Sequence, residues 1–106
     1  MKRGEVWWVN FDPSVGGEIQ KRRPAVIVSN DSANAFLNRV QVVPLTSNTT
    51  KVYPGEALVN VAGKQGKAMA SQLTTASKQR LRRRYAILSL PDLRAVEKAI
   101  VVQLNL

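Results

Sequence analysis

Short blocks of hydrophobic residues alternate with polar, turn-forming residues along most of the chain. Blocks rich in Val, Ile and aromatic residues predict strands at residues 5–11, 25–28, 40–46, 56–61, 67–75 and 83–89. The run from Ala25 to Val28 is short, β-branched and bounded by turn formers, so we expect a strand that is buried on both faces. Pro44 cannot donate to a sheet ladder, which predicts an edge or a bulge in the third strand.

Helical signals are concentrated at the end of the chain. The sequence Ser89-Leu90-Pro91-Asp92 resembles a capping box. After it, apolar residues recur at three- and four-residue spacing and predict a helix that closes one side of the core; they are Leu93, Val96, Ile100 and Leu104. Shorter helical segments are expected at 32–38, with Asp31 or Ser32 as N-cap, and at 76–81.

Turn formers separate these elements, at Pro54-Gly55 and across Gly63 to Gly66. Many short strands with one terminal helix predict a mainly β fold with short helices, arranged as a small barrel. The pattern alone does not distinguish an SH3-like barrel from an OB-like one.

Length and composition favour one domain, residues 1–106, with a modest core from 44% hydrophobic residues. No apolar run approaches the roughly 20 residues that span a membrane. The N-terminus leads directly into a strand pattern and not into a signal peptide, and the chain has no Cys. These features favour a cytoplasmic protein.

The charge is strongly one-sided, with 16 Lys and Arg against 7 Asp and Glu and a net charge of +9. Such an excess in a small domain predicts a polyanionic partner, with nucleic acid first and an acidic protein segment second. The cations form two clusters, Lys21 to Arg23 in the loop after the first strand, and five residues near the last strand, which are Lys78, Arg80, Arg82, Arg83 and Arg84.

The missing residue types restrict the chemistry. Without His or Cys, a two-histidine ribonuclease mechanism and a cysteine nucleophile are excluded, and the acids are scattered singly, so we expect no metal site and no cofactor. RNA can supply its own nucleophile, the 2′-hydroxyl, if the protein positions the phosphate and stabilises its charge. Arg23 is the first candidate, because Pro24 fixes the backbone where a loop enters a strand. On these grounds alone a catalytic Arg23 and a merely phosphate-binding one are equally favoured.

A series of motifs, in order along nearly the whole chain, resembles the MazF/PemK (Kid) family of bacterial toxin endoribonucleases. The motifs are Arg3-Gly4-Glu5-Val6-Trp7, Asp12-Pro13, Gly16-Gly17-Glu18, Arg23-Pro24-Ala25-Val26, Val28-Ser29-Asn30-Asp31, Val43-Pro44-Leu45-Thr46-Ser47 and Lys78-Gln79-Arg80-Leu81. Each motif alone is a weak signal, but their ordered occurrence in so short a chain is specific.

The resemblance implies an SH3-like CcdB/PemK-type barrel with a C-terminal helix, assembled as a homodimer. It implies the toxin of a type II toxin–antitoxin system, a sequence-specific, metal-independent endoribonuclease for single-stranded RNA, with mRNA as the expected target. Cleavage by 2′-hydroxyl attack would leave 2′,3′-cyclic phosphate and 5′-hydroxyl ends. The family's functional arginine and threonine fall on Arg23 and Thr46. A cognate antitoxin with an acidic, partly disordered segment is the implied protein partner.

This chain departs from the family pattern at the proposed acid and base positions, which align with Gly17, Met69 and Ser71. Glu18 remains a candidate base by elimination, or an anchor for the loop. Lys21 and Arg22 are expected to hold the RNA backbone. Polar residues in loops and at strand ends are the candidates for reading RNA bases; they are Glu18, Gln20, Asn30, Asp31, Ser47, Ser71 and Gln72.

Two other functions compete with the nuclease. One is a CcdB-like toxin that binds DNA gyrase, and the other is a non-catalytic nucleic-acid-binding barrel. The barrel ranks last, because such modules present aromatic stacking platforms, whereas Trp7, Trp8 and Phe11 share one predicted core strand.

Overall fold

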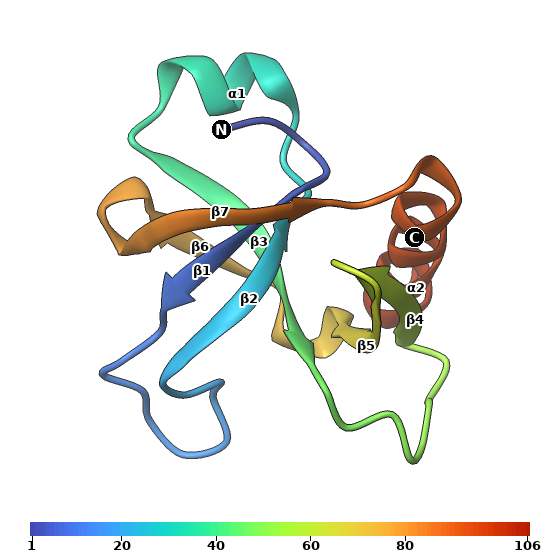
Figure 1. The fold of residues 1–106 in the computed structure, drawn as a ribbon. Helices are drawn as coiled ribbons and strands as arrows, with labels where there is room; N and C mark the ends of the chain where they lie inside the picture. Colours follow the sequence, from blue (N-terminus) through green and yellow to red (C-terminus); the bar gives the residue numbers. More distant parts are fainter.

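The computed structural model describes all 106 residues as a half-barrel of seven strands with two helices (Figure 1). The strands are β1 (Glu5–Asn10), β2 (Arg22–Ile27), β3 (Arg39–Thr46), β4 (Glu56–Val61), β5 (Lys64–Met69), β6 (Thr74–Ser77) and β7 (Leu81–Ile87). The helices are α1 (Asp31–Phe36) and α2 (Leu90–Leu104), with short 3-10 turns η1 (Ala70–Gln72) and η2 (Lys78–Arg80). The predicted fold class, a mainly β barrel with a C-terminal helix, is confirmed.

All the paired strands are antiparallel, in the order β4-β5-β3-β2-β1-β7. One edge of β3 serves two partners, because its first half pairs with β6 and its last two residues pair with β5. Pro44 lies between these two pairings and is fully buried. Of the two alternatives predicted for Pro44, an edge or a bulge, the edge is wrong, because β3 is paired on both sides. The missing N–H of Pro44 falls where β3 changes partner.

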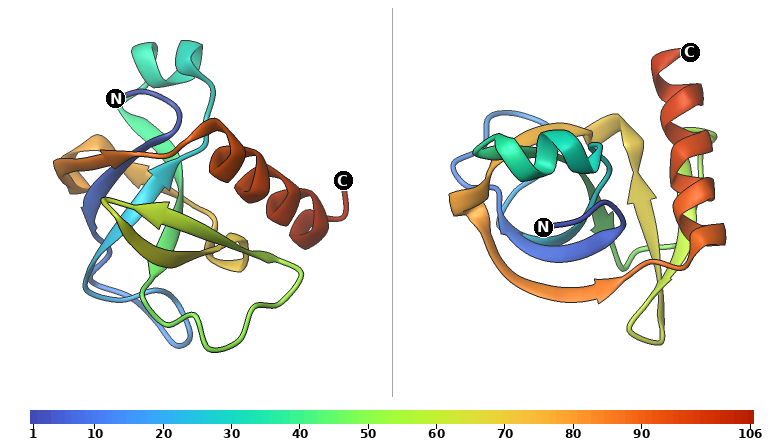
Figure 2. Two further views of the ribbon diagram at one scale, coloured as in Figure 1. Left: turned by 45° about the vertical axis from the view of Figure 1, so that its right-hand side comes forward. Right: turned by 90° about the horizontal axis from the view of Figure 1, so that it is seen from above.

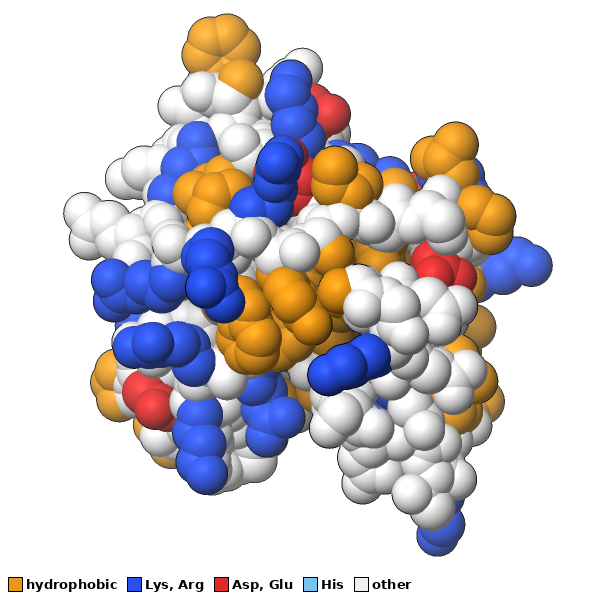
Figure 3. Space-filling view, in the orientation of Figure 1, with side chains coloured by type: hydrophobic (Ala, Val, Ile, Leu, Met, Phe, Trp, Pro, Cys, Tyr) orange, Lys and Arg blue, Asp and Glu red, His pale blue; other side chains and the backbone are white.

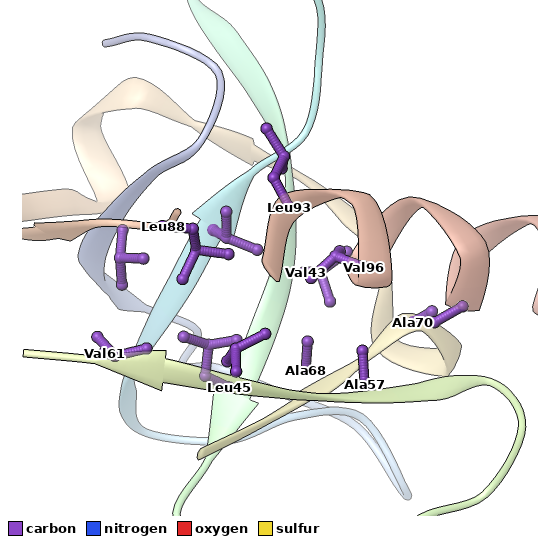
Figure 4. Close-up of a cluster of buried hydrophobic side chains, with 13 residues drawn as sticks. Val43, Leu45, Ala57, Val61, Ala68, Ala70, Leu88, Leu93 and Val96 are labelled. Atoms are coloured by element: carbon purple, nitrogen blue, oxygen red, sulfur yellow. The ribbon is translucent and has the colours of Figure 1, made fainter. Parts of the chain in front are cut away.

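Two hydrophobic clusters fill the molecule on either side of β2 and β3. The larger lies between the sheet and α2, where Leu93 and Val96 project from the helix into the cluster (Figure 4). The smaller lies inside the strongly curved part of the barrel and includes Val9, Ile27 and Val42. Ala25, Val26 and Ile27 are fully buried and contribute to both clusters, so two-sided burial is confirmed for three of the four residues of the predicted run. The fourth, Val28, lies beyond the end of β2 and is half-buried.

The C-terminal helix forms as predicted. Ser89 is its N-cap, with the side-chain oxygen accepting from the Asp92 N–H at 3.2 Å. α2 packs beside β4, and α1 lies across one end of the ring of strands (Figure 2). Ala99 is buried instead of the predicted Ile100, and Leu104 is exposed because the helix runs past the edge of the sheet it covers.

Three predicted boundaries are wrong for a common reason. The expected strand 67–75 is two strands, because β5 pairs with β4 while β6 pairs with β3, and η1 redirects the chain between them. The preceding turn is the two residues Ala62 and Gly63, both at positive φ, so Gly66 lies within β5. The expected helix at 76–81 is reduced to η2, and β7 begins at Leu81. Pairing across the sheet overrides local propensity in each case.

The first helix begins one residue earlier than expected. Its N-cap is Asn30, whose side chain accepts from the Ala33 N–H at 2.8 Å, and not Asp31 or Ser32. Asp31 instead accepts from the Arg3 N–H at 2.8 Å and so ties the N-terminus to α1. Hydrogen bonds from that N–H and from the Asn34 side chain hold the pKa of Asp31 below its ordinary value of 3.8. No helix of the structure has the length and apolar character needed to cross a membrane.

Candidate active site

The register of β2 and β3 brings the two principal candidates together. Ala25 pairs with Pro44 and Val26 with Val43. The same register continued by two residues places Arg23 opposite Thr46, and residues two apart on a strand share a face. Both side chains line one groove of about 290 Å³.

We call this the Arg23 groove. It is lined by Trp8, Lys21, Arg22, Arg23, Pro24, Leu45, Thr46, Ser47, Val61, Lys64, Gln65, Gly66 and Tyr85. Four of these residues are cations and none is acidic. On the face drawn in Figure 3, Lys and Arg side chains gather beside a central hydrophobic patch over β1, β2 and β7. The groove therefore has the charge and shape to hold an anion.

The Arg23 side chain is held by one hydrogen bond within the protein, and its other N–H donors remain free. Its Nε donates to the Gln20 carbonyl oxygen at 3.2 Å, and it forms no ion pair. Both Nη atoms are therefore available for the bidentate contact that guanidinium makes with phosphate. The Thr46 hydroxyl oxygen accepts from the Asn48 N–H at 3.3 Å, so its proton remains free for donation.

The loop before Arg23 is held at two points. Gln72 accepts from the Ile19 N–H and donates to the Gly17 carbonyl, both at 3.2 Å. Arg80 donates from Nη1 to the carbonyl oxygens of Asn10 at 3.0 Å and Asp12 at 2.7 Å. Arg80 thus fixes the start and Gln72 the middle of a loop that contains two glycines.

On the β5 side of Thr46, a buried lysine holds the neighbouring loop in place. Lys67, the β5 partner of Thr46, is only 8% exposed. Its Nζ lies 3.2 Å from a Glu56 carboxylate oxygen and donates to the Lys51 carbonyl at 2.7 Å. This cation ties the loop that follows Thr46 to the sheet. A charge buried in this way requires its partner.

The predicted site residues divide into four places. Five of them line the Arg23 groove: Lys21, Arg22, Arg23, Thr46 and Ser47. Glu18, Ser71 and Gln72 line a second groove of about 400 Å³ that also contains Arg80. In it, the Glu18 carboxylate accepts from the Val15 N–H at 2.6 Å, as a loop anchor would. Asn30 and Asp31 lie at the start of α1 and bond to neighbouring backbone, and Gln20 is exposed in the loop.

Sequence reasoning missed three residues of the Arg23 groove. Trp8 was expected in a core strand and Tyr85 was not singled out, yet both side chains line the groove. Lys64 enters because the tight turn after β4 brings the start of β5 back beside Val61. The adjacent Trp7 and Trp8 were the usable signal. They put aromatic side chains on both faces of the strand, which left two alternatives open, a buried aromatic core or a face covered by a second subunit or a partner.

The arrangement is suited to holding one phosphate between a guanidinium and a hydroxyl. Arg23 can neutralise the charge that develops on the phosphate oxygens, while the Thr46 hydroxyl donates to an oxygen of the same group. The cations at the rim favour entry of a polyanion. No three acidic side chains come together anywhere in the structure.

Comparison with known proteins agrees with this reading. Residues 2–104 match the family described as PemK-like, MazF-like toxin of type II toxin–antitoxin system. The endoribonuclease MazF9 of Mycobacterium tuberculosis is 41% identical over 115 residues, which cover 100% of this chain and 98% of that protein.

Solved structures give the same result. A crystal structure of MazF from Deinococcus radiodurans superimposes with a TM-score of 0.87 at 27% identity, covering 100% of this chain and 97% of that one. A MazE-MazF structure from the same organism gives a TM-score of 0.78 at 27% identity, with 100% and 97% covered. The resemblance in the motifs is thereby confirmed, and the chain belongs to the PemK-like, MazF-like family of type II toxin–antitoxin toxins.

Proposed function

We propose that the protein is a toxin endoribonuclease that cleaves single-stranded RNA without a metal ion. The observation that carries this proposal is the meeting of Arg23 and Thr46 in a groove with four cations and no acid. A relative that is 41% identical over 98% of its length is named an endoribonuclease. Cleavage proceeds by attack of the ribose 2′-hydroxyl on the adjacent phosphate and leaves a 2′,3′-cyclic phosphate and a 5′-hydroxyl end.

In this mechanism Arg23 binds two phosphate oxygens and stabilises their charge in the transition state. Thr46 donates a hydrogen bond to the phosphate or orients the 2′-hydroxyl. Lys21, Arg22 and Ser47 hold the neighbouring backbone. Because DNA lacks the attacking hydroxyl, the reaction is specific for RNA.

We also propose a homodimer as the working form. Large hydrophobic residues stay exposed on and after the last turns of α2, with Val101 at 45%, Leu104 at 50% and Leu106 at 81%. A broad depression beside α2 is lined partly by apolar residues, among them Val28, Leu73 and Ile100. Apolar surface of this kind is typical of an interface, and a second copy would cover it.

A cognate antitoxin with an acidic, extended segment is the proposed protein partner, acting in the cytoplasm. The charge of +9 and the acid-free Arg23 groove favour such a segment over a neutral one. One solved neighbour is a MazE-MazF complex, in line with a partner of this class.

The test is cleavage of a mixed-sequence RNA in EDTA, with mapping of cut sites and end groups. Arg23→Ala should lower the cleavage rate about 10²- to 10³-fold, the usual effect of removing one donor that stabilises transition-state charge. Arg39→Ala is the matched control, because Arg39 is an exposed arginine at the opposite end of β3 from Thr46. It should cleave at the wild-type rate.

The outcomes separate the competing functions. Cuts at a recurring short sequence, with 5′-hydroxyl ends, support the nuclease. Binding without cutting would indicate a nucleic-acid-binding barrel, and inertness towards RNA with inhibition of DNA gyrase would indicate a CcdB-like toxin. Equal rates for Arg23→Ala and Arg39→Ala would remove Arg23 from the mechanism.

A further inference from the structure

We infer that Trp8 and Tyr85 form a stacking platform for one base of the bound single-stranded RNA, beside the phosphate held by Arg23. This inference rests on the proposed function and adds a base-binding subsite to it. The two rings are neighbours, with centroids 5.4 Å apart and planes inclined by 44°. Both line the Arg23 groove, so a base on the platform lies within one binding surface with Arg23 and Thr46.

β7 has two bulges, and one of them places Tyr85 at this position. Val6 of β1 pairs with Ala86, but Trp7 pairs with Arg84, so Tyr85 is an extra residue with no partner across the ladder. A second shift between Trp8 and Val9 leaves Arg82 unpaired in the same way. Bulges re-aim side chains and are frequent next to active sites. Here the bulges leave Tyr85 and Arg82 of the edge strand β7 without partners in β1, one on each side of the residues paired with Trp7 and Trp8.

Trp8 connects the Arg23 groove to a second basic depression. Trp8 and Arg22 line both, and the second depression is completed by Arg82 and Arg83. Neither surface includes an acidic side chain. The aromatic pair therefore lies between two sets of cations, the combination of stacking surface and charged track that binds single-stranded nucleic acid. The hydrophobic patch with its basic border is visible in Figure 3.

The exposure of the rings fits a binding surface better than a core. Tyr85 is 36% exposed and Trp8 is half-buried, whereas the buried clusters contain neither residue. The indole Nε1 of Trp8 is buried without a hydrogen-bond partner in the chain. Such a donor is uncommon in a folded protein, but it is closed to solvent, so the platform rests on the exposed part of the two rings and not on this nitrogen. By contrast, Trp7 Nε1 donates to the Glu5 carboxylate at 2.9 Å.

The test uses 2′-O-methyl RNA oligonucleotides, which lack the nucleophile and are bound without being cut. An abasic oligonucleotide of equal length carries the same charge without bases. Tyr85→Ala should weaken binding of the base-containing oligonucleotide about 5- to 150-fold and leave binding of the abasic one unchanged. Tyr85→Phe keeps the ring and should bind like the wild type. A thermal melt of each variant checks that the fold is retained.

Fluorescence gives an independent measurement, because the chain has only two tryptophans. The Trp7→Phe variant reports Trp8 alone and should be quenched by the base-containing oligonucleotide but not by the abasic one. In the matched Trp8→Phe variant the remaining Trp7 should respond to neither.

The platform is refuted if Tyr85→Ala weakens both oligonucleotides equally, or if Trp8 emission is unchanged when the base-containing one binds. If either result is found while Arg23→Ala loses cleavage, the proposed nuclease function is retained and only the platform is rejected. Absence of binding to any oligonucleotide overturns both.

Discussion

The two hydrogen bonds of Gln72 to the β1–β2 loop predict that this residue positions the loop. Sequence reasoning offered Gln72 as a base-reading residue, but its amide oxygen and nitrogen are both occupied by Ile19 and Gly17. We expect Gln72→Ala to release the middle of the loop while the sheet stays intact. The effect should reach Arg23, four residues beyond Ile19 along the chain.

The magnitude follows from the geometry. A neutral hydrogen bond contributes about 0.5–1.5 kcal/mol net. Both bonds measure 3.2 Å and lie at a partly exposed side chain, so we take the lower part of this range for each. Their loss should destabilise the closed loop by about 1–2 kcal/mol, which corresponds to about 5- to 30-fold faster exchange of the Ile19 amide hydrogen.

The assay is hydrogen exchange by NMR, followed at the Ile19 amide. Gln79→Ala is the matched control, because Gln79 is an exposed glutamine whose side chain makes no hydrogen bond. Gln72→Glu is a sharper variant. It keeps the acceptor for Ile19 but places a carboxylate oxygen against the Gly17 carbonyl, so it should also loosen the loop. Unchanged Ile19 exchange in Gln72→Ala, together with weaker RNA binding, would refute the positioning role and restore base reading.

Three further predictions concern stability and binding. Although burial alone raises the pKa of Glu5, hydrogen bonds from Trp7 Nε1 and the Lys2 N–H bring it below its ordinary value of 4.5. Its contribution to stability is therefore present above pH 4.5 and lost on further acidification, so Glu5→Gln should flatten that acid limb in denaturant titrations. Val96→Ala should cost about 2–3 kcal/mol in the same measurement, whereas Val52→Ala, at a loop residue that is 45% exposed, should cost less than about 0.5 kcal/mol. Oligonucleotide affinity should fall steeply with added salt, and a flat response would contradict phosphate tracking by the two basic surfaces.

Local signals predicted the parts of the fold that depend on nearby residues. The buried strand around Val26 was predicted because a β-branched run between turn formers has few other solutions. The C-terminal helix was predicted from Ser89 and the apolar spacing after it, since capping and periodicity act within a few residues. The division of residues 64–77 into two strands was not predictable, because it depends on pairing with β4 and β3, which lie far away in the sequence.

The candidate site likewise has parts that local sequence predicts and parts that depend on distant contacts. Composition was enough to favour a chemistry in which cations hold the phosphate and the RNA 2′-hydroxyl is the nucleophile, because the chain is positively charged and has no His or Cys; local pattern singled out Arg23 at the entry to a rigid strand. Which residues share a groove depends on the folded chain. The pairing of β2 with β3 brought Arg23 and Thr46 to one groove, a bulge in β7 left Tyr85 free of the ladder beside Trp8, and the β4–β5 hairpin added Lys64. Each of these depends on contacts between residues distant in the chain, and no local propensity encodes them.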